Sequence, residues 1–280
     1  MMSRALIHIE QAVKLIKEQT ERVVILDASI DKVGQKLDNN NLELIPNSHF
    51  LDIENAFSDK NIPLPHTMVD AVTFEQEVRK LGVNQDSIVL LYDRWGVYSS
   101  PRAWWMFKYM GFDQVYVING GMPAWKSADL PIVDAYSVVE NIGNFVAKPD
   151  PQWIIKIDEL KELVGQDDVH ITDARSAGRF SGAAPEPRPN LKSGHIPGSE
   201  NIPFDQVLDA AYFRSNEEIA PLYENKAFPT GQNIFTCGSG ITAAVLALGA
   251  YELGYKNIRV YDGSWSEWGS DPDTIVDQHI

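Results

Sequence analysis

The sequence has 280 residues, of which 44% are hydrophobic and 22% charged, as in a soluble globular protein of one large or two medium domains. Its net charge of −15 argues against nucleic acid or an anionic membrane surface as a partner. Cys237 is the only cysteine, which excludes an internal disulfide and a zinc site built from several thiols.

The chain begins with a predicted helix. Leu6, Ile9, Val13 and Ile16 recur at helical spacing within the first 18 residues, and the charged residues between them break up any signal-peptide core. No apolar run approaches the length that spans a bilayer. These features predict a cytoplasmic protein that contacts no membrane.

Strands and helices then alternate along the chain. Continuous apolar or β-branched runs predict strands at residues 23–27, 88–91, 115–118, 169–173, 234–236 and 258–261. Helical stretches follow some of these strands, as at residues 101–110 and 242–253. The alternation predicts an α/β fold with parallel sheets covered by helices.

The two halves of the sequence repeat each other. Asp-Ala-Ser at residues 27–29 and Asp-Ala-Arg at residues 173–175 each end an apolar strand. Three further residues recur at one constant spacing, namely Gly111, Gly120 and Trp125 as Gly254, Gly263 and Trp268. A period this long predicts two tandem domains. We expect an N-terminal domain at residues 1–138, a linker at 139–152 and a C-terminal domain at 153–280.

Cys237 lies in a glycine-bearing turn between a strand-like run at residues 233–236 and an apolar helical run at 243–253. Backbone N–H groups and the helix start favour a thiolate there, which makes a reactive nucleophile. The alternative is a buried structural cysteine. The counterpart of Cys237 in the first half is Asp93. The second half is therefore predicted to be the catalytic one and the first half a support.

Two arginines lie in a Gly- and Pro-rich loop at residues 176–194. Arg179 and Arg188 are suited to hold a carboxylate, since guanidinium binds it through two parallel hydrogen bonds. The alternative is that they are solvated, or that they pair with Glu186 or Asp173 within the loop.

Four other polar residues are candidate site residues. His195 precedes Ile-Pro-Gly and is interpreted as a structural tie rather than a base. Glu54 and His66, taken alone, are more typical of a surface. Ser239 does not fit the G-x-S-x-G pattern of serine hydrolases, and its hydroxyl is interpreted as a proton relay near Cys237.

Several motifs together resemble the two-domain rhodanese-type sulfurtransferases, specifically the 3-mercaptopyruvate sulfurtransferases. The resemblance spans nearly the whole chain. The motifs are CGSGITA at 237–243, DARSAGRF at 173–180, PEPR at 185–188, GHIPG at 194–198, YDGSWSEWG at 261–269 and YSSPRAWWMF at 98–107.

The resemblance implies two tandem rhodanese-like domains, each a mainly parallel sheet flanked by helices. It implies a persulfide on Cys237, in a loop that includes Gly238, Gly240, Ile241 and Thr242. No metal or organic cofactor is implied. The donor would be mercaptopyruvate, and the acceptor a thiol such as thioredoxin, a small thiol, or cyanide.

The resemblance also implies roles for side chains around the thiol. Arg179 and Arg188 would hold the carboxylate and keto group of the donor, while Ser239 would act with Glu54 and His66. The chain departs from the family at Glu54, where aspartate is frequent. It departs again at residues 44–47, where Leu-Ile-Pro-Asn stands in place of the frequent His-Ile-Pro-Gly.

Three other functions compete with this one. Enzymes that use thiosulfate resemble one another in basic residues just after the cysteine, and here Gly238 and Ser239 are neutral, which favours mercaptopyruvate. A cysteine-loop phosphatase needs arginine where this chain has Ala243. A non-enzymatic sulfur carrier would keep Cys237 without needing Arg179 and Arg188.

Overall fold

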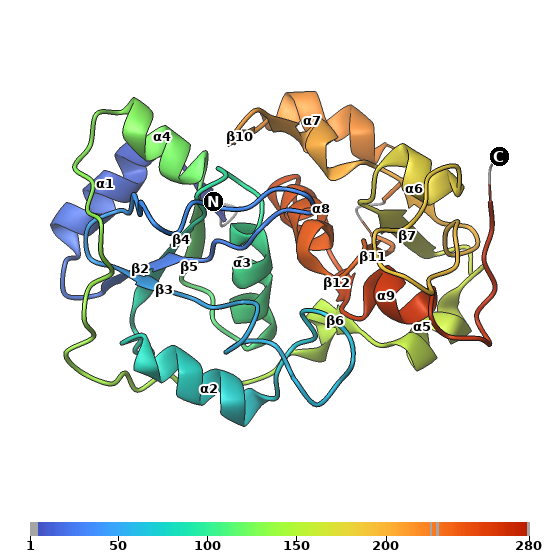
Figure 1. Ribbon diagram of the computed structural model, residues 1–280, viewed down its shortest axis with the longest axis horizontal. Coiled ribbons are helices and arrows are strands. Elements are labelled where there is room, and N and C mark those ends of the chain that lie inside the picture. The colour runs from blue at the N-terminus through green and yellow to red at the C-terminus, as the bar shows by residue number, and fades with distance from the viewer. Residues whose placement is uncertain (1–4, 225, 228–229, 279–280) are drawn as a thin grey trace. The chain divides into compact units, whose positions relative to one another are not determined.

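The computed structural model describes residues 5–224, 226–227 and 230–278, and these form two compact units (Figure 1). The first unit contains the chain up to Lys60, Met68–Asp150 and Ala210–Phe213. The second contains Asn61–Thr67, Pro151–Asp209 and the chain from Arg214 onward. The short segment 61–67 therefore packs with the second unit, although it is flanked in sequence by parts of the first.

The first unit is built on a five-stranded parallel sheet with the order β1-β5-β4-β2-β3. Its strands are β1 (Leu6–Ile7), β2 (Val23–Asp27), β3 (Ser48–Phe50), β4 (Ile88–Tyr92) and β5 (Val115–Ile118). Its helices are α1 (Ile9–Glu18), α2 (Ala71–Lys80), α3 (Ser100–Tyr109) and α4 (Gly121–Ser127). The short strand β10 (Tyr212–Phe213) also belongs to this unit.

The second unit repeats this topology, with the sheet order β6-β12-β11-β7-β8. Its strands are β6 (Ile154–Ile155), β7 (Val169–Asp173), β8 (Glu200–Asn201), β9 (Leu208–Asp209), β11 (Gln232–Thr236) and β12 (Ile258–Tyr261). Its helices are α5 (Ile157–Leu163), α6 (Ala177–Ser181), α7 (Asn216–Tyr223), α8 (Ile241–Glu252) and α9 (Ser264–Trp268), with 3-10 turns η1 (Pro151–Trp153) and η2 (Phe204–Val207). The same strand order in both sheets confirms the predicted duplication and the α/β class.

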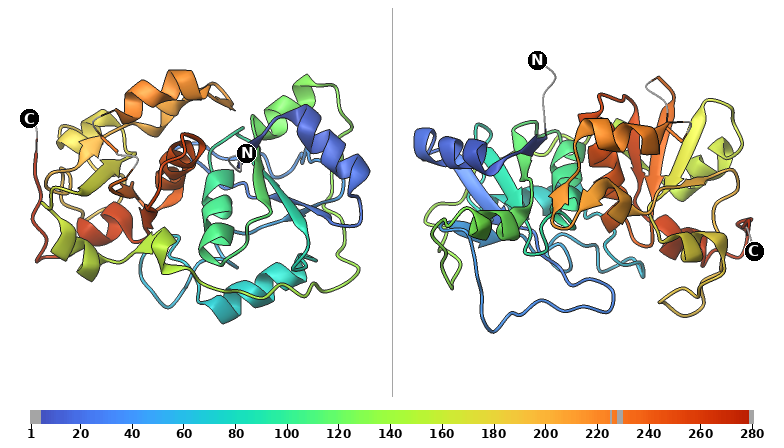
Figure 2. Two further views of the ribbon diagram at one scale, coloured as in Figure 1. Left: turned by 180° about the vertical axis from the view of Figure 1, so that it is seen from behind. Right: turned by 90° about the horizontal axis from the view of Figure 1, so that it is seen from above.

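Helices cover both faces of each sheet, because successive strand residues point to opposite faces. In the first unit, Ile25 and Leu90 face a buried cluster with α1 and α4, while α3 packs on the other face (Figures 1 and 2). In the second unit, Ile171 and Ile234 face α5 and α9, and α8 packs on the opposite face. Nearly all residues of helix α8 are buried, which agrees with its apolar residues lying on every side of the helix.

The start of the chain differs from the expected single helix. Leu6 lies in strand β1 and pairs with Val117 of β5, and the helix begins only at Ile9. Just before the helix, the backbone N–H of His8 donates to Gln11 Oε1 at 3.0 Å. The helical spacing between Leu6 and the apolar residues of α1 is coincidental. A strand of two residues is too short to show the alternating pattern that would have identified it.

The segment expected to link the domains runs as coil along the first unit. The N–H of Phe145 donates to the carbonyl of Val83 at 3.2 Å, and that of Lys148 to Met110 at 2.9 Å. The ring of Phe145 is 1% exposed and packs edge-on against Phe74. This burial and these bonds fix residues up to Asp150 as part of the first unit.

The departure at residues 44–47 leaves the local turn unchanged. Asn47 has φ 62° and Gly198 has φ 71°, and asparagine tolerates this left-handed conformation better than most residues. In both units the turn closes with the same hydrogen bond, from Ser48 to Ile45 at 3.2 Å and from Ser199 to Ile196 at 3.0 Å.

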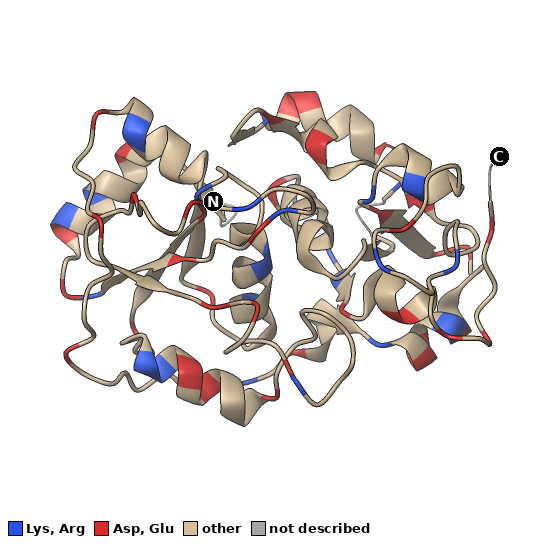
Figure 3. Ribbon diagram, viewed as in Figure 1, with Lys and Arg blue, Asp and Glu red and all other residues tan. Residues whose placement is uncertain are grey.

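Charged residues are spread along the helices and loops of both units (Figure 3). Among the described residues, no helix is long and apolar enough to cross a membrane.

Candidate active site

Cys237 is positioned by strand β11 and helix α8 of the second unit. It follows Thr236 at the carboxyl end of the strand, and α8 begins four residues later at Ile241. Gly240 has φ 80°, which a side chain would oppose, and this turn directs its N–H to Cys237 Sγ at 3.1 Å. The thiol is 2% exposed. Since the first N–H groups of a helix have no intrahelical partner, they are available to a group at this position.

The start of α9 holds the carbonyl groups of the cysteine loop. The N–H of Trp265 donates to the carbonyl of Cys237 at 2.9 Å. The carbonyl of Gly238 accepts from Ser266 twice, from its N–H at 3.0 Å and from its Oγ at 2.6 Å. Ser264 Oγ accepts from the N–H of Cys237 at 3.3 Å. With the carbonyls bound to α9, the loop can present N–H groups to the sulfur.

Arg179, on α6, lies against this loop. A Cβ added at Gly238 would come within 3.0 Å of Arg179 Nη2, so only glycine fits there without moving the guanidinium. The guanidinium forms a bidentate pair with Glu186, from Nε at 3.2 Å and Nη2 at 2.5 Å. The alternative pairing with Glu186 is therefore present, and it leaves Arg179 beside the cysteine loop with 21% of its side chain exposed.

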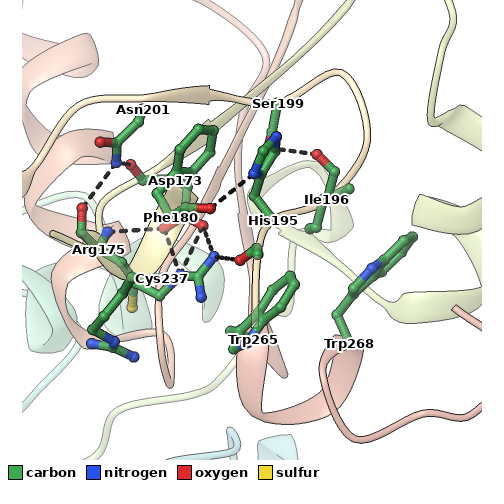
Figure 4. Close-up of polar contacts among 12 residues, drawn as sticks. Asp173, Arg175, Phe180, His195, Ile196, Ser199, Asn201, Cys237, Trp265 and Trp268 are labelled. Carbon is green, nitrogen blue, oxygen red and sulfur yellow. Dashed lines mark hydrogen bonds and ion pairs between the residues drawn. The ribbon is translucent and has the colours of Figure 1, made fainter. Parts of the chain in front are cut away.

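Arg175 is the buried centre of the adjoining network (Figure 4). It donates to Asp173 from Nε and Nη2, to Glu186 at 2.8 Å and to the carbonyl of Gly194 at 2.7 Å. Its guanidinium carbon lies 4.1 Å from the ring centroid of Trp265. Burial by itself lowers the pKa of Arg175, but the attraction of Asp173 and Glu186 exceeds it, so the pKa is raised and the charge is held.

His195 is a structural residue, as its sequence context indicated. It is 1% exposed, its Nδ1 lies 2.8 Å from the carbonyl of Phe180, and its ring stacks on that of Phe180 at 3.9 Å between centroids. Its backbone pairs with Asp277 in both directions.

Ser239 and His66 meet within the second unit. His66 Nδ1 lies 3.0 Å from Ser239 Oγ, and the serine is 8% exposed. His66 belongs to the segment 61–67 and has φ 60°. The left-handed backbone of a non-glycine residue is uncommon and here presents the imidazole to the serine. Sequence spacing gave no indication of this pair, which is separated by 173 positions.

The remaining expected site residues are placed as follows. Glu54 is an exposed residue of the first unit, and its carbonyl accepts from Lys60 Nζ at 2.6 Å. Arg188 is half-buried in the loop that also carries Glu186. Ile241 is buried and Thr242 half-buried in the first turn of α8.

Some residues that shape the site were not expected from the sequence. Ser264 and Ser266 of α9 were not singled out, and Glu186 was considered only as a partner for the arginines. Two signals were available, namely the YDGSWSEWG motif at residues 261–269, which contains both serines, and the recurrence of Asn-Gly-Gly at residues 119–121 as Asp-Gly-Ser at residues 262–264. Among the described residues, no group of three or more His, Cys, Asp or Glu side chains is placed to hold a metal ion.

Comparison with known proteins places this arrangement in a family. The model of the rhodanese-like domain matches residues 6–128 and 156–271. A 3-mercaptopyruvate sulfurtransferase of Escherichia coli strain K12 is 36% identical over 260 residues, covering 91% of this chain and 92% of the relative. One of Rattus norvegicus is 36% identical over 286 residues, covering 98% and 96%. The crystal structure of SseA from Escherichia coli, presented as a 3-mercaptopyruvate sulfotransferase, superposes with a TM-score of 0.82 at 31% identity, covering 94% of this chain and 99% of that one. The chain therefore belongs to the rhodanese-like family, which it matches in both of its units.

Proposed function

We propose that the protein is a sulfurtransferase that moves sulfur from 3-mercaptopyruvate through a Cys237 persulfide to a thiol or to cyanide. The observation that carries this proposal is the hydrogen bond from the Gly240 N–H to Cys237 Sγ at the start of α8, with the Arg179 guanidinium against Gly238. A nucleophilic sulfur in an N–H cradle beside a cation suits an anionic donor. The names of the relatives at 36% identity support the choice of donor.

The first half-reaction transfers sulfur to the enzyme. The Cys237 thiolate attacks the donor sulfur, an S–S bond forms, and the C–S bond breaks with its electron pair going to carbon as the enolate of pyruvate. Arg179 and Arg188 hold the carboxylate and keto oxygen and stabilise the enolate charge. A proton then reaches the enolate carbon and pyruvate leaves.

The proton reaches the enolate through the side chains beside the thiol. Ser239 Oγ donates it, and His66, at 3.0 Å, replaces it. We extend the proposal to Glu54, which would act with His66 as the resemblance to the family implies. In the second half-reaction, an acceptor thiolate or cyanide attacks the outer sulfur and releases the Cys237 thiolate, so no oxidant or reductant is consumed.

Thiosulfate is the alternative donor. It would leave a doubly charged sulfite, and the residues after Cys237 are the neutral Gly238 and Ser239, which favours mercaptopyruvate. We also propose thioredoxin or a small thiol as the acceptor and a cytoplasmic location, both carried over from the sequence.

One experiment tests the function. The protein is mixed with one equivalent of mercaptopyruvate and no added acceptor, so that no excess donor thiol can take the sulfur. Pyruvate is measured and the intact mass is recorded. We expect pyruvate release equal to the protein concentration and a gain of one sulfur on Cys237, with neither in a Cys237→Ser control. Faster turnover with thiosulfate under matched conditions would contradict the choice of donor, and sulfur uptake that survives Arg179→Ala and Arg188→Ala unchanged would favour a carrier.

A further inference from the structure

Glu186 is a buried carboxylate that the proposed chemistry does not use directly. Its side chain is 2% exposed, and it binds two arginines at once. Arg175 donates to Oε1 at 2.8 Å, while Arg179 donates to Oε1 at 3.2 Å and to Oε2 at 2.5 Å. Both oxygens of Glu186 are therefore committed to guanidinium groups.

This carboxylate connects Arg179 to the sheet. Arg175 is fixed on Asp173 at the end of β7, with distances of 2.9 Å and 2.7 Å, and both side chains are 0% exposed. Glu186 bridges from this fixed guanidinium to Arg179. The two carboxylates and two guanidinium groups cancel in charge, so the buried network is paired throughout.

Arg179 is the one of the two arginines that can reach a substrate. It is 21% exposed, whereas Arg175 is 0% exposed, and its Nη2 lies at the cysteine loop. The bidentate pair uses Nε and Nη2, and no hydrogen bond of Nη1 occurs among the described residues. An arginine side chain has many rotamers, so without Glu186 its guanidinium would spread over several positions.

We propose that Glu186 is a positioning residue for the sulfur donor, acting through Arg179; this rests on the proposed function. Two effects oppose each other when its charge is removed. The donor would lose the repulsion of a carboxylate, but Arg179 would lose its fixed position. The second effect prevails, because the charge of Glu186 is already balanced by the two arginines, whereas nothing else in the described network holds Arg179 in place.

The test compares Glu186→Gln with a matched control. We expect the KM for mercaptopyruvate to rise about tenfold, with the KM of the acceptor thiol changed less than about twofold. The control is Glu159→Gln. Glu159 is another carboxylate of the same unit that binds an arginine through both oxygens, since the two Nη atoms of Arg259 donate to it at 2.7 Å each. This control should leave the KM of the donor unchanged. A KM that stays the same or falls in Glu186→Gln overturns the inference.

A double variant separates positioning from general structural damage. In an Arg179→Ala background, Glu186→Gln should lower kcat/KM by less than about twofold, since its effect passes through Arg179. Additive losses overturn the inference. If Glu186→Gln does not fold, Arg175→Lys replaces it. Lysine keeps the positive charge but cannot form the several hydrogen bonds by which the guanidinium joins Asp173 to Glu186. The same rise in the KM for mercaptopyruvate is expected.

Binding without turnover distinguishes this inference from the function. Calorimetry of mercaptopyruvate with the Cys237→Ser protein should show binding about tenfold weaker after Glu186→Gln. If the unaltered enzyme releases no pyruvate but this weakening is found, the function fails and the role of Glu186 stands. If pyruvate is released and binding is not weakened, the role of Glu186 fails and the function stands.

Discussion

At the scale of single residues, Ser239 joins two segments that are far apart in the sequence. Its hydroxyl lies two residues after the thiol and 3.0 Å from His66 Nδ1. A hydroxyl paired with imidazole can give up a proton and regain it, which the enolate step requires and the persulfide transfer to an acceptor does not. The two half-reactions should therefore respond differently to its loss.

We predict that Ser239→Ala slows pyruvate release in a single turnover by about 100-fold. Sulfur transfer to a thiol from protein loaded beforehand with polysulfide should change less than about twofold. His66→Gln should behave in the same way, and Ser270→Ala, which removes a hydroxyl bonded to the carbonyls of Ser266 and Glu267, is the control. Equal slowing of both half-reactions would exclude the proton role.

At the scale of elements, the loop before α3 shows how the first unit fills the equivalent of the cysteine cradle. Asp93, the counterpart of Cys237, places its own carboxylate there and is 0% exposed. It accepts five hydrogen bonds, from the N–H of Trp95, Tyr98, Ser99 and Ser100 and from Ser100 Oγ, at 2.7–3.0 Å. The same kind of strand–turn–helix connection thus directs backbone N–H groups at a side chain in both units.

We predict that Asp93→Ala lowers the free energy of unfolding by about 2–4 kcal/mol, because several buried donors lose their acceptor. Denaturant unfolding measures this. The control is Asp70→Ala, which removes an exposed cap of α2 from the N–H groups of Val72 and Thr73 and should cost less. Equal losses of unfolding free energy in the two variants would show that the burial of the Asp93 hydrogen bonds adds nothing to stability.

Local patterns predicted most strands and helices, whereas the pairing of distant residues such as His66 and Ser239 was indicated only by the resemblance to a known family. The central strand β4 is buried on both faces and therefore appears as a continuous apolar run, whereas β11 begins with Gln232 and Asn233 and shows an apolar or β-branched run only at residues 234–236. Strand β1 has two residues and exists only because β5 pairs with it, so no local pattern distinguishes it from α1. The pairing of His66 with Ser239 likewise depends on where the segment 61–67 folds, which no spacing encodes.

At the scale of the whole molecule, both units have a loop whose backbone N–H groups surround a side chain, but only the second unit carries the arginine–carboxylate network beside it. In the second unit, Asp173 pairs with Arg175, and Glu186 extends the network to Arg179 beside the thiol. In the first unit, residues 28–44 contain no arginine. The buried Asp27 has Ser29 at the position of Arg175 and pairs instead with Arg94 at 3.4 Å. Burial raises the pKa of Asp27 despite hydrogen bonds from Ser29 and Tyr136 and the charge of Arg94.

This difference predicts that a thiol alone does not restore activity in the first unit. We expect Asp93→Cys combined with Cys237→Ser to release pyruvate from mercaptopyruvate at less than about a hundredth of the normal rate, because residues 28–44 contain no arginine and the guanidinium of Arg94 is already held by Asp27, Asp38 and Asn39. Asp93→Cys alone serves as the control and should keep the normal rate, which shows that the substitution does not unfold the enzyme. Substantial pyruvate release by the double variant would mean that the N–H cradle suffices and that the arginine network of the second unit contributes little to catalysis.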